Sequence, residues 1–215
     1  MTEYNQIFAM SAMIGLVGYI FADYMQIYLR YRGAVNSKIA SGYSNAMKSM
    51  VGMRMGAVIY TFLVAISVER GIQTNFLIGL YAIALPCCAV PIAFMVPRLK
   101  RNSGVTHELS EQCSGILWQP LVVSAAAITF NLLGLAIPFV AGSKFPEWRL
   151  TLAQSSIFFN VFYTILTVFF IENRFAKLVD ANDPKYHSFT YSVTLGRVIG
   201  CAFGGIILST LFVIQ

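Results

Sequence analysis

The sequence predicts an all-α, polytopic membrane protein with six transmembrane helices, and three observations lead to this fold class. Of the 215 residues, 57% are hydrophobic and only 11% are charged, and the mean hydropathy is +0.68. Soluble domains contain about 25% charged residues. Six apolar runs are each long enough to cross a bilayer, which takes about 20 residues of helix. The polar stretches between them are too short for a separate core, so we expect one transmembrane domain over residues 1–215.

The six runs follow one another along the chain, and each is expected to form one helix. The first is long and has no small-residue cleavage pattern, so it is expected to be retained rather than removed as a signal peptide. Prolines in the third run (Pro86, Pro91) and in the fourth (Pro120, Pro138) predict kinks. The expected spans are about residues 7–29, 47–68, 74–96, 116–141, 152–171 and 189–214.

Basic residues gather in the loops after the first, third and fifth spans. These loops hold ten of the fifteen lysines and arginines, whereas the loops on the other side hold three. Lysine and arginine are enriched in cytoplasmic loops, so we expect these loops inside and both termini outside, an N-out/C-out topology. The ten residues are Arg30, Arg32, Lys38, Lys48, Arg98, Lys100, Arg101, Arg174, Lys177 and Lys185.

The net charge of +6 is explained by this asymmetry and does not indicate nucleic-acid binding. No basic stripe interleaves with aromatic residues on a polar face, so no nucleic acid is expected as a partner. The four cysteines have neither zinc-ligand nor disulfide spacing, and no metal or other cofactor is predicted. The sequence also lacks a nucleophile with a base at a familiar spacing and a phosphate-binding glycine loop, which argues against an enzyme.

Three ionisable residues lie inside the predicted spans: Asp23, Arg54 and Arg197. A charge at membrane depth costs about 2.5–3.5 kcal/mol on insertion scales, so each needs a partner, a water-filled cavity or a ligand. At 1.5 Å per residue, we expect them about 9, 11 and 12 Å from the cytoplasmic ends of their helices. If spans one, two and six are neighbours, the three charges can form one cluster. Asp23 would then pair with one arginine and leave a net positive site for an anion.

Glycines flank both arginines at four-residue spacing. This spacing lets transmembrane helices approach closely, so we expect helix packing at the site. The glycines are Gly52 and Gly56 around Arg54, and Gly196, Gly200 and Gly204 around Arg197. A simpler interpretation of the charges is also open, namely that an Asp–Arg pair only locks the bundle together.

The charged positions resemble a family of bacterial membrane proteins, the Amj ("alternate to MurJ") lipid II flippases. That family has an acidic residue in its first span, then an arginine, a glycine, an Ala-Ser step, a serine and a second arginine. Near its C-terminus it has a Leu-x-Asp step followed by Arg-x-x-Gly in the last span. The matching residues here are Asp23, Arg30, Gly33, Ala40-Ser41, Ser44 and Arg54, then Leu178-Val179-Asp180 and Arg197-Val198-Ile199-Gly200.

The resemblance implies a flippase that moves an undecaprenyl-diphosphate-linked cell-wall precursor, with lipid II as the leading substrate. The substrate would pass from the cytoplasmic to the outer leaflet of the bacterial inner membrane. Arg54 and Arg197, with Arg30 and Lys48, would bind the diphosphate headgroup, because the planar arginine fork can hold phosphate oxygens in pairs. Asp23 would act as the counter-charge and gate.

Three other functions remain open from the sequence. The first is a flippase for another polyprenyl-linked glycan, since sugar selectivity would depend on cavity shape. The second is a small channel or ion-coupled transporter that uses Asp23 as its proton site. The third is a scaffold subunit that transports nothing. A homo-oligomer is also open, because the glycine faces can pack within one chain or between chains.

Overall fold

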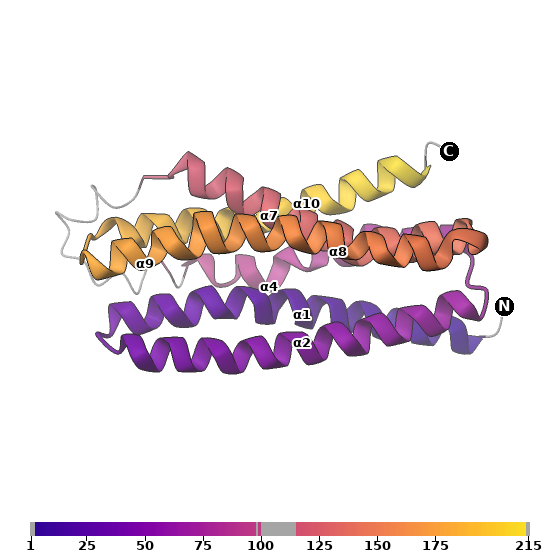
Figure 1. Ribbon diagram of the computed structural model, residues 1–215, viewed down its shortest axis with the longest axis horizontal. Helices are drawn as coiled ribbons and strands as arrows, with labels where there is room; N and C mark the ends of the chain where they lie inside the picture. The colour runs from indigo at the N-terminus through magenta and orange to yellow at the C-terminus, as the bar shows by residue number, and fades with distance from the viewer. Residues whose placement is uncertain (1–2, 98, 100–114, 214–215) are drawn as a thin grey trace.

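Long helices lying along a common axis make up the computed structural model of this chain (Figure 1). The structure describes residues 3–97, 99 and 115–213. Every regular element in these ranges is a helix, and six helices or helical rods are long and apolar enough to cross a membrane. The all-α fold class is therefore confirmed, as is the expectation of six helices long and apolar enough to span a membrane. The predicted loop residues Arg98, Lys100 and Arg101 lie outside the described residues.

The element bounds extend beyond most of the predicted spans. The elements are α1 (Glu3–Val35), α2 (Ile39–Glu69), α3 (Thr74–Cys87), α4 (Ala89–Ala93), α7 (Trp118–Lys144), η1 (Pro146–Trp148), α8 (Arg149–Ile165), η2 (Leu166–Glu172), α9 (Asn173–Asp180) and α10 (Lys185–Val213). One extension is at the start of α2, which begins at Ile39 rather than near residue 47. Eight residues of helix are about 12 Å long, so the α1–α2 hairpin projects beyond its predicted membrane segment.

Two glycines hold α1 and α2 together near their turn. A Cβ on Gly33 would lie 2.7 Å from the Cα of Gly42, and a Cβ on Gly42 would lie 2.8 Å from the Cα of Gly33. No side chain fits at either position without moving the backbone. The two helices are therefore in direct backbone contact at this end, and their packing continues along their length.

The third span is broken, as its prolines predict. Helix α3 ends at Cys87, directly after Pro86, and α4 begins at Ala89 and contains Pro91. Each proline lacks an N–H and crowds the preceding turn, which interrupts regular helix. Helix α7, in contrast, runs from Trp118 to Lys144 as one element with Pro138 inside it.

The fifth crossing is a single rod of successive helical segments over Pro146–Asp180. It lies at the outside of the bundle, since only 11% of its most apolar stretch is buried. Residues Leu166–Glu172 form a π-helix between α8 and α9. The periodicity of an apolar run gives no sign of such a change in winding, and the sequence did not predict it.

Helix α10 packs into α7 along its glycine ladder. A Cβ on Gly196 would overlap the carbonyl oxygen of Leu121, and a Cβ on Gly200 would overlap Ile128. Ser124 Oγ adds a hydrogen bond to the carbonyl oxygen of Val193 at 2.8 Å. Gly204 lies on the same face of α10, where an added Cβ would lie 3.3 Å from Leu132.

The two glycines of α2 lie in different surroundings. A Cβ on Gly56 would meet Tyr19 of α1 at 3.6 Å, an ordinary contact, while one on Gly52 would meet nothing within 4 Å. Gly52 was expected at a helix contact, but it lies exposed on α2, four residues before Gly56. The helix–helix contact at this level is made by Ser49 instead, whose hydroxyl donates to the carbonyl oxygen of Ala22 at 2.8 Å.

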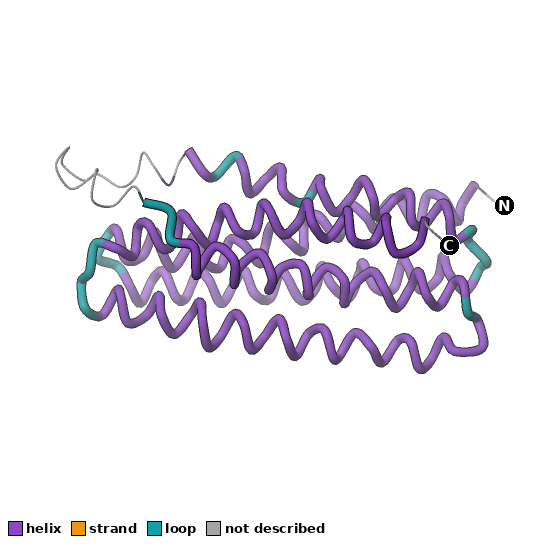
Figure 2. Tube along the Cα trace, turned by 90° about the horizontal axis from the view of Figure 1, so that it is seen from above, coloured by secondary structure: helices purple, strands orange, loops and turns teal. Residues whose placement is uncertain are grey.

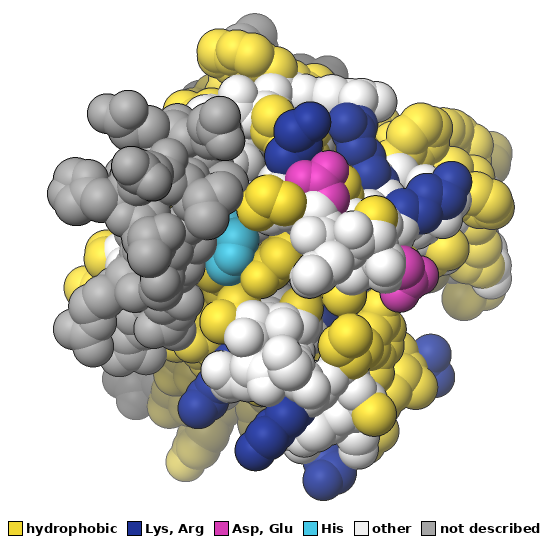
Figure 3. All heavy atoms as spheres, turned by 90° about the vertical axis from the view of Figure 1, so that its left-hand side faces the viewer, with side chains coloured by type: hydrophobic (Ala, Val, Ile, Leu, Met, Phe, Trp, Pro, Cys, Tyr) yellow, Lys and Arg dark blue, Asp and Glu magenta, His cyan; other side chains and the backbone are white. Residues whose placement is uncertain are grey.

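Apart from the break between α3 and α4, the turns that join successive helices lie at the two ends of the bundle (Figure 2). Helix α1 begins and α10 ends at the same end, as Figure 1 shows. The opposite end, formed by the α1–α2 and α9–α10 turns, carries several lysine and arginine side chains (Figure 3). We call this the basic end. Among the residues that the structure describes, its lysines and arginines are Arg30, Arg32, Lys38, Arg174, Lys177 and Lys185.

Candidate functional site: a buried ion pair beside an open groove

The centre of the site is an ion pair between α1 and α10. Arg197 Nη1 donates to Asp23 Oδ2, and the two residues are 2% and 3% exposed. Arg197 is also among the largest fully buried side chains in the described chain. A pair removed from water in this way offsets the high cost of each separate charge, so neither partner is expected at this depth without the other.

A third helix contributes Tyr163. Its hydroxyl group donates to Asp23 Oδ1 at 2.5 Å, so both oxygens of the carboxylate accept a hydrogen bond. On the other side of the pair, Arg197 Nε is buried with no hydrogen-bond partner among the described residues. The arginine therefore keeps an unused donor while it is paired with Asp23.

A second polar contact lies one helical turn from the pair. Tyr19 of α1 donates its hydroxyl group to Asn131 Oδ1 of α7 at 3.1 Å. Tyr19 precedes Asp23 by four residues, which is about 6 Å along the helix. Asn131 is fully buried, and its Nδ2 has no partner among the described residues. The sequence marks Asn131 only as a polar residue at depth, and it does not reveal its link to Tyr19.

Tyr19 also lines a groove of about 480 Å³. Helices α2 and α8 form its walls and α7 forms its floor. Its lining is mostly apolar, but Tyr19 and Asn160 lie along it, and Asn160 precedes Tyr163 by three residues. At the other extreme, Glu69 ends α2 and Arg149 begins α8, at the end of the bundle away from the basic end. The groove thus runs from the vicinity of the ion pair toward the end where the termini lie.

The structure does not bring Arg54 into this site. Gly56 faces Tyr19 of α1, and Arg54 lies two residues away, which is about 200° around the helix. Arg54 is consequently exposed on the outer side of α2. The structure therefore pairs Asp23 with Arg197 and leaves Arg54 outside the cluster.

Lys48 and Arg30 also lie apart from the ion pair. Lys48 is exposed on α2. Arg30 Nη1 is 2.6 Å from Glu172 Oε1 in η2, and its guanidinium lies 5.2 Å from the centre of the Tyr43 ring. This second ion pair is two turns of α1, about 10 Å, closer to the basic end than Asp23.

The fifth helical rod contacts α1 just before its π-helix and at the last residue of that segment. Tyr163 lies before the segment and Glu172 ends it, and they contact Asp23 and Arg30 of α1 respectively. Segments of π-helix occur frequently at functional sites because they alter which side chains face a neighbour. Tyr163 was missed from sequence, since an aromatic residue in an apolar run is usually apolar packing.

The arrangement holds an arginine against a carboxylate in the interior of the bundle. Within the described ranges, no three His, Cys, Asp or Glu side chains are grouped closely enough to hold a metal ion. No family model, curated protein or solved structure matches this chain.

Proposed function

We propose that this protein translocates a polyprenyl-diphosphate-linked glycan precursor, with lipid II as the leading substrate. The direction would be from the cytoplasmic to the outer leaflet of the bacterial inner membrane. The observation that carries the proposal is the buried Asp23–Arg197 pair, one helical turn from Tyr19, which lines a mostly apolar groove. The resemblance of these charged positions to the Amj flippases supplies the substrate class.

In this proposal Arg197 is the residue that meets the diphosphate. Asp23 holds Arg197 while the site is empty, and a diphosphate replaces the carboxylate when it arrives. The exchange is favourable because a guanidinium binds phosphate oxygens through paired, charge-assisted hydrogen bonds. The unused Nε of Arg197 would complete such a pair.

The groove would hold apolar parts of the lipid while the headgroup passes. It lies on the side of the ion pair that faces away from the basic end. In the proposed N-out/C-out orientation, this side is the outer half of the membrane, where the product is released. The apolar part is the polyprenyl tail: its end next to the diphosphate would lie in the groove, and the rest would remain in the bilayer beside α2 and α8.

The ion pair between Arg30 and Glu172 would close the opposite, cytoplasmic side. It joins α1 to η2 at the basic end. Opening it would free Arg30 to meet an incoming headgroup and would widen the path toward Arg197. Lys48 and Arg54 on the outside of α2 would be contacts for a headgroup that approaches along that helix.

A direct test uses the purified protein in liposomes that contain fluorescent lipid II. Transfer of the label between leaflets is measured by quenching from outside with a membrane-impermeant reagent. Liposomes with the protein should show transfer that liposomes without it lack. If no polyprenyl-diphosphate lipid is transferred in a panel that includes other glycans, the proposal is wrong.

The second candidate is an ion-coupled transporter or channel, which the burial of Asp23 at membrane depth favours. The same liposomes distinguish the two functions through a pH-sensitive dye inside the vesicles. Proton flux that depends on Asp23 in the absence of any lipid substrate would favour this candidate. Lipid transfer without such flux would favour the flippase.

A further inference from the structure

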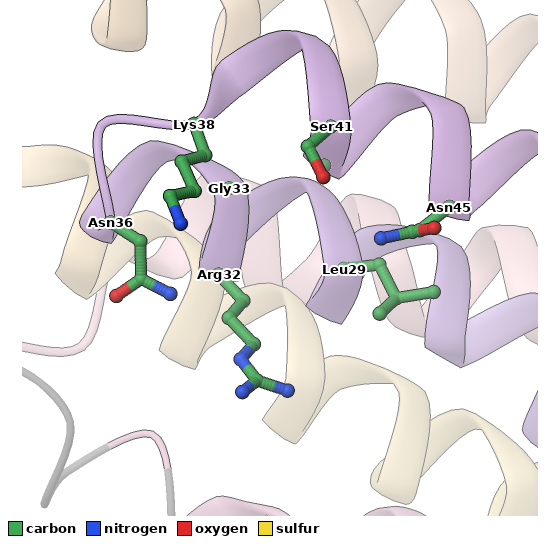
Figure 4. Close-up of a pocket in the computed structure, with 8 residues that line it drawn as sticks. Leu29, Arg32, Gly33, Asn36, Lys38, Ser41 and Asn45 are labelled. Carbon is green, nitrogen blue, oxygen red and sulfur yellow. The ribbon is translucent and has the colours of Figure 1, made fainter.

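A separate polar pocket of about 300 Å³ lies at the basic end, between the last turns of α1 and the first turns of α2. Figure 4 shows Lys38, Ser41 and Asn45 on the α2 side of this pocket and Arg32 on the α1 side. The lining consists of Leu29, Arg32, Gly33, Asn36, Lys38, Ser41, Gly42 and Asn45. These eight described residues include two cations and no carboxylate.

The walls of the pocket are fixed by the tight hairpin. Lys38 N donates to the carbonyl oxygen of Gly33 at 2.8 Å, and Gly42 N donates to the carbonyl oxygen of Lys38 at 2.9 Å. Ser37 adopts a positive φ of 53°, which reverses the chain between the helices. Together with the contact between Gly33 and Gly42, these bonds determine where Lys38 and Ser41 lie relative to Arg32.

The polar groups of the pocket suit a phosphate. Arg32 and Lys38 supply positive charge, while Asn36, Ser41 and Asn45 supply neutral hydrogen-bond donors. Both cations are exposed and have long side chains, so they can reach a group held between the helices. The first N–H groups of α2 add to this preference, because no described side chain caps that helix start and its first turn has no acidic residue.

The position of the pocket indicates the source of the phosphate. Its residues lie between 29 and 45, where the helices extend past the predicted membrane segments of 7–29 and 47–68. The headgroup layer begins directly beyond the hydrocarbon core. A phosphate at this height is therefore most readily supplied by a membrane lipid.

We propose that this pocket binds the phosphate of an anionic lipid headgroup at the membrane surface. The site is distinct from the Asp23–Arg197 pair, and it does not depend on the proposed translocation. Binding can be measured without transport, so a failure of one proposal leaves the other intact.

The test measures binding of short-chain phosphatidic acid to the purified protein by calorimetry. Short-chain phosphatidylcholine and inorganic phosphate serve as the comparison ligands. We expect phosphatidic acid to bind and the variant Arg32→Gln/Lys38→Gln to bind it about 100-fold more weakly, since each charged hydrogen bond contributes roughly a factor of ten. Higher salt should weaken binding to the unaltered protein.

Two further variants show whether the pocket or the overall charge is responsible. Lys177→Gln/Lys185→Gln removes two exposed charges from the same end and should bind like the unaltered protein. Ser41→Leu keeps the charge, fills the pocket and should reduce binding sharply. Equal binding by Arg32→Gln/Lys38→Gln or by Ser41→Leu would overturn the proposal. Equal binding of inorganic phosphate would assign the site to a soluble phosphate rather than a lipid.

Discussion

Asp23 is the residue on which the buried site depends, because it alone neutralises Arg197 among the described residues. Replacing it by asparagine keeps the side-chain shape but leaves a buried, unpaired guanidinium. Breaking a buried ion pair in this way costs about 3–5 kcal/mol. We expect Asp23→Asn to lower the free energy of unfolding by that amount, measured by denaturant titration in detergent. A change below about 1 kcal/mol, the size found for exposed pairs, would show that the pair is solvated.

Tyr163 should contribute less, because it is a neutral donor to a carboxylate that keeps its other partner. Removing its hydroxyl group in Tyr163→Phe should lower the free energy of unfolding by about 1 kcal/mol. Tyr4→Phe is the matched control, since Tyr4 is 70% exposed on the same helix as Asp23. Equal melting temperatures for the two variants would mean that the Tyr163 contact is not maintained.

The sequence predicts part of this site and misses the rest for physical reasons. Charges inside apolar runs are visible in any sequence, so Asp23, Arg54 and Arg197 could be identified as buried-charge candidates. The direction of each side chain depends on which face of a helix meets its neighbour. Arg54 faces outward because Gly56, about 200° away around α2, faces α1. Tyr163 and Asn131 become functional candidates only through contacts that the fold creates.

At the scale of elements, the packing of α10 on α7 depends on its glycines. A Cβ on Gly200 would overlap Ile128 and the carbonyl oxygen of Ala125, which cannot move without shifting α7. We expect Gly200→Ala to reduce the free energy of unfolding by about 1–3 kcal/mol, as overpacking does. The measurement is the same denaturant titration.

Gly52→Ala provides the matched control for this packing effect. Its Cβ would meet nothing within 4 Å, and alanine favours helix over glycine by about 0.5–1 kcal/mol. This variant should therefore be neutral or slightly stabilised. The account of α10 would be contradicted if the two substitutions changed stability in the same direction by the same amount.

Most of the helices are longer than the apolar runs from which they were predicted. Hydropathy detects the part of a helix that lies in lipid, so it placed the second span near residues 47–68. The first two turns of α2 contain Ser41, Tyr43 and Asn45 and continue the helix into the polar layer. The hairpin pocket is built from this extension, and for that reason the sequence did not reveal it.

For the whole molecule, the central expectation is the orientation in the membrane. Lysine and arginine side chains gather at the basic end, whereas α1 begins and α10 ends at the opposite end. Because lysine and arginine are enriched on the cytoplasmic side, this arrangement supports a cytoplasmic basic end. In a variant without native cysteines, Asn36→Cys should resist a membrane-impermeant maleimide added outside spheroplasts. Gln73→Cys, an exposed residue before α3, should react. The opposite pattern of labelling would reverse the proposed topology.

The ion pair has two possible roles at this scale, a lock for the bundle or a gate for an anionic headgroup. Replacing both charges by apolar residues separates these roles, because such a replacement is often neutral or stabilising for a buried pair. Asp23→Leu/Arg197→Met should therefore fold and insert at the level of the unaltered protein. It would lack the groups that exchange with a diphosphate.

The most direct measurement is the accessibility of lipid II at the outer leaflet in cells depleted of their other flippases. Cells that express the unaltered protein should expose lipid II to an external probe. Cells that express Asp23→Leu/Arg197→Met at the same level should expose no more than cells without the protein. Full exposure with the double variant would contradict the account and leave the ion pair as a structural lock.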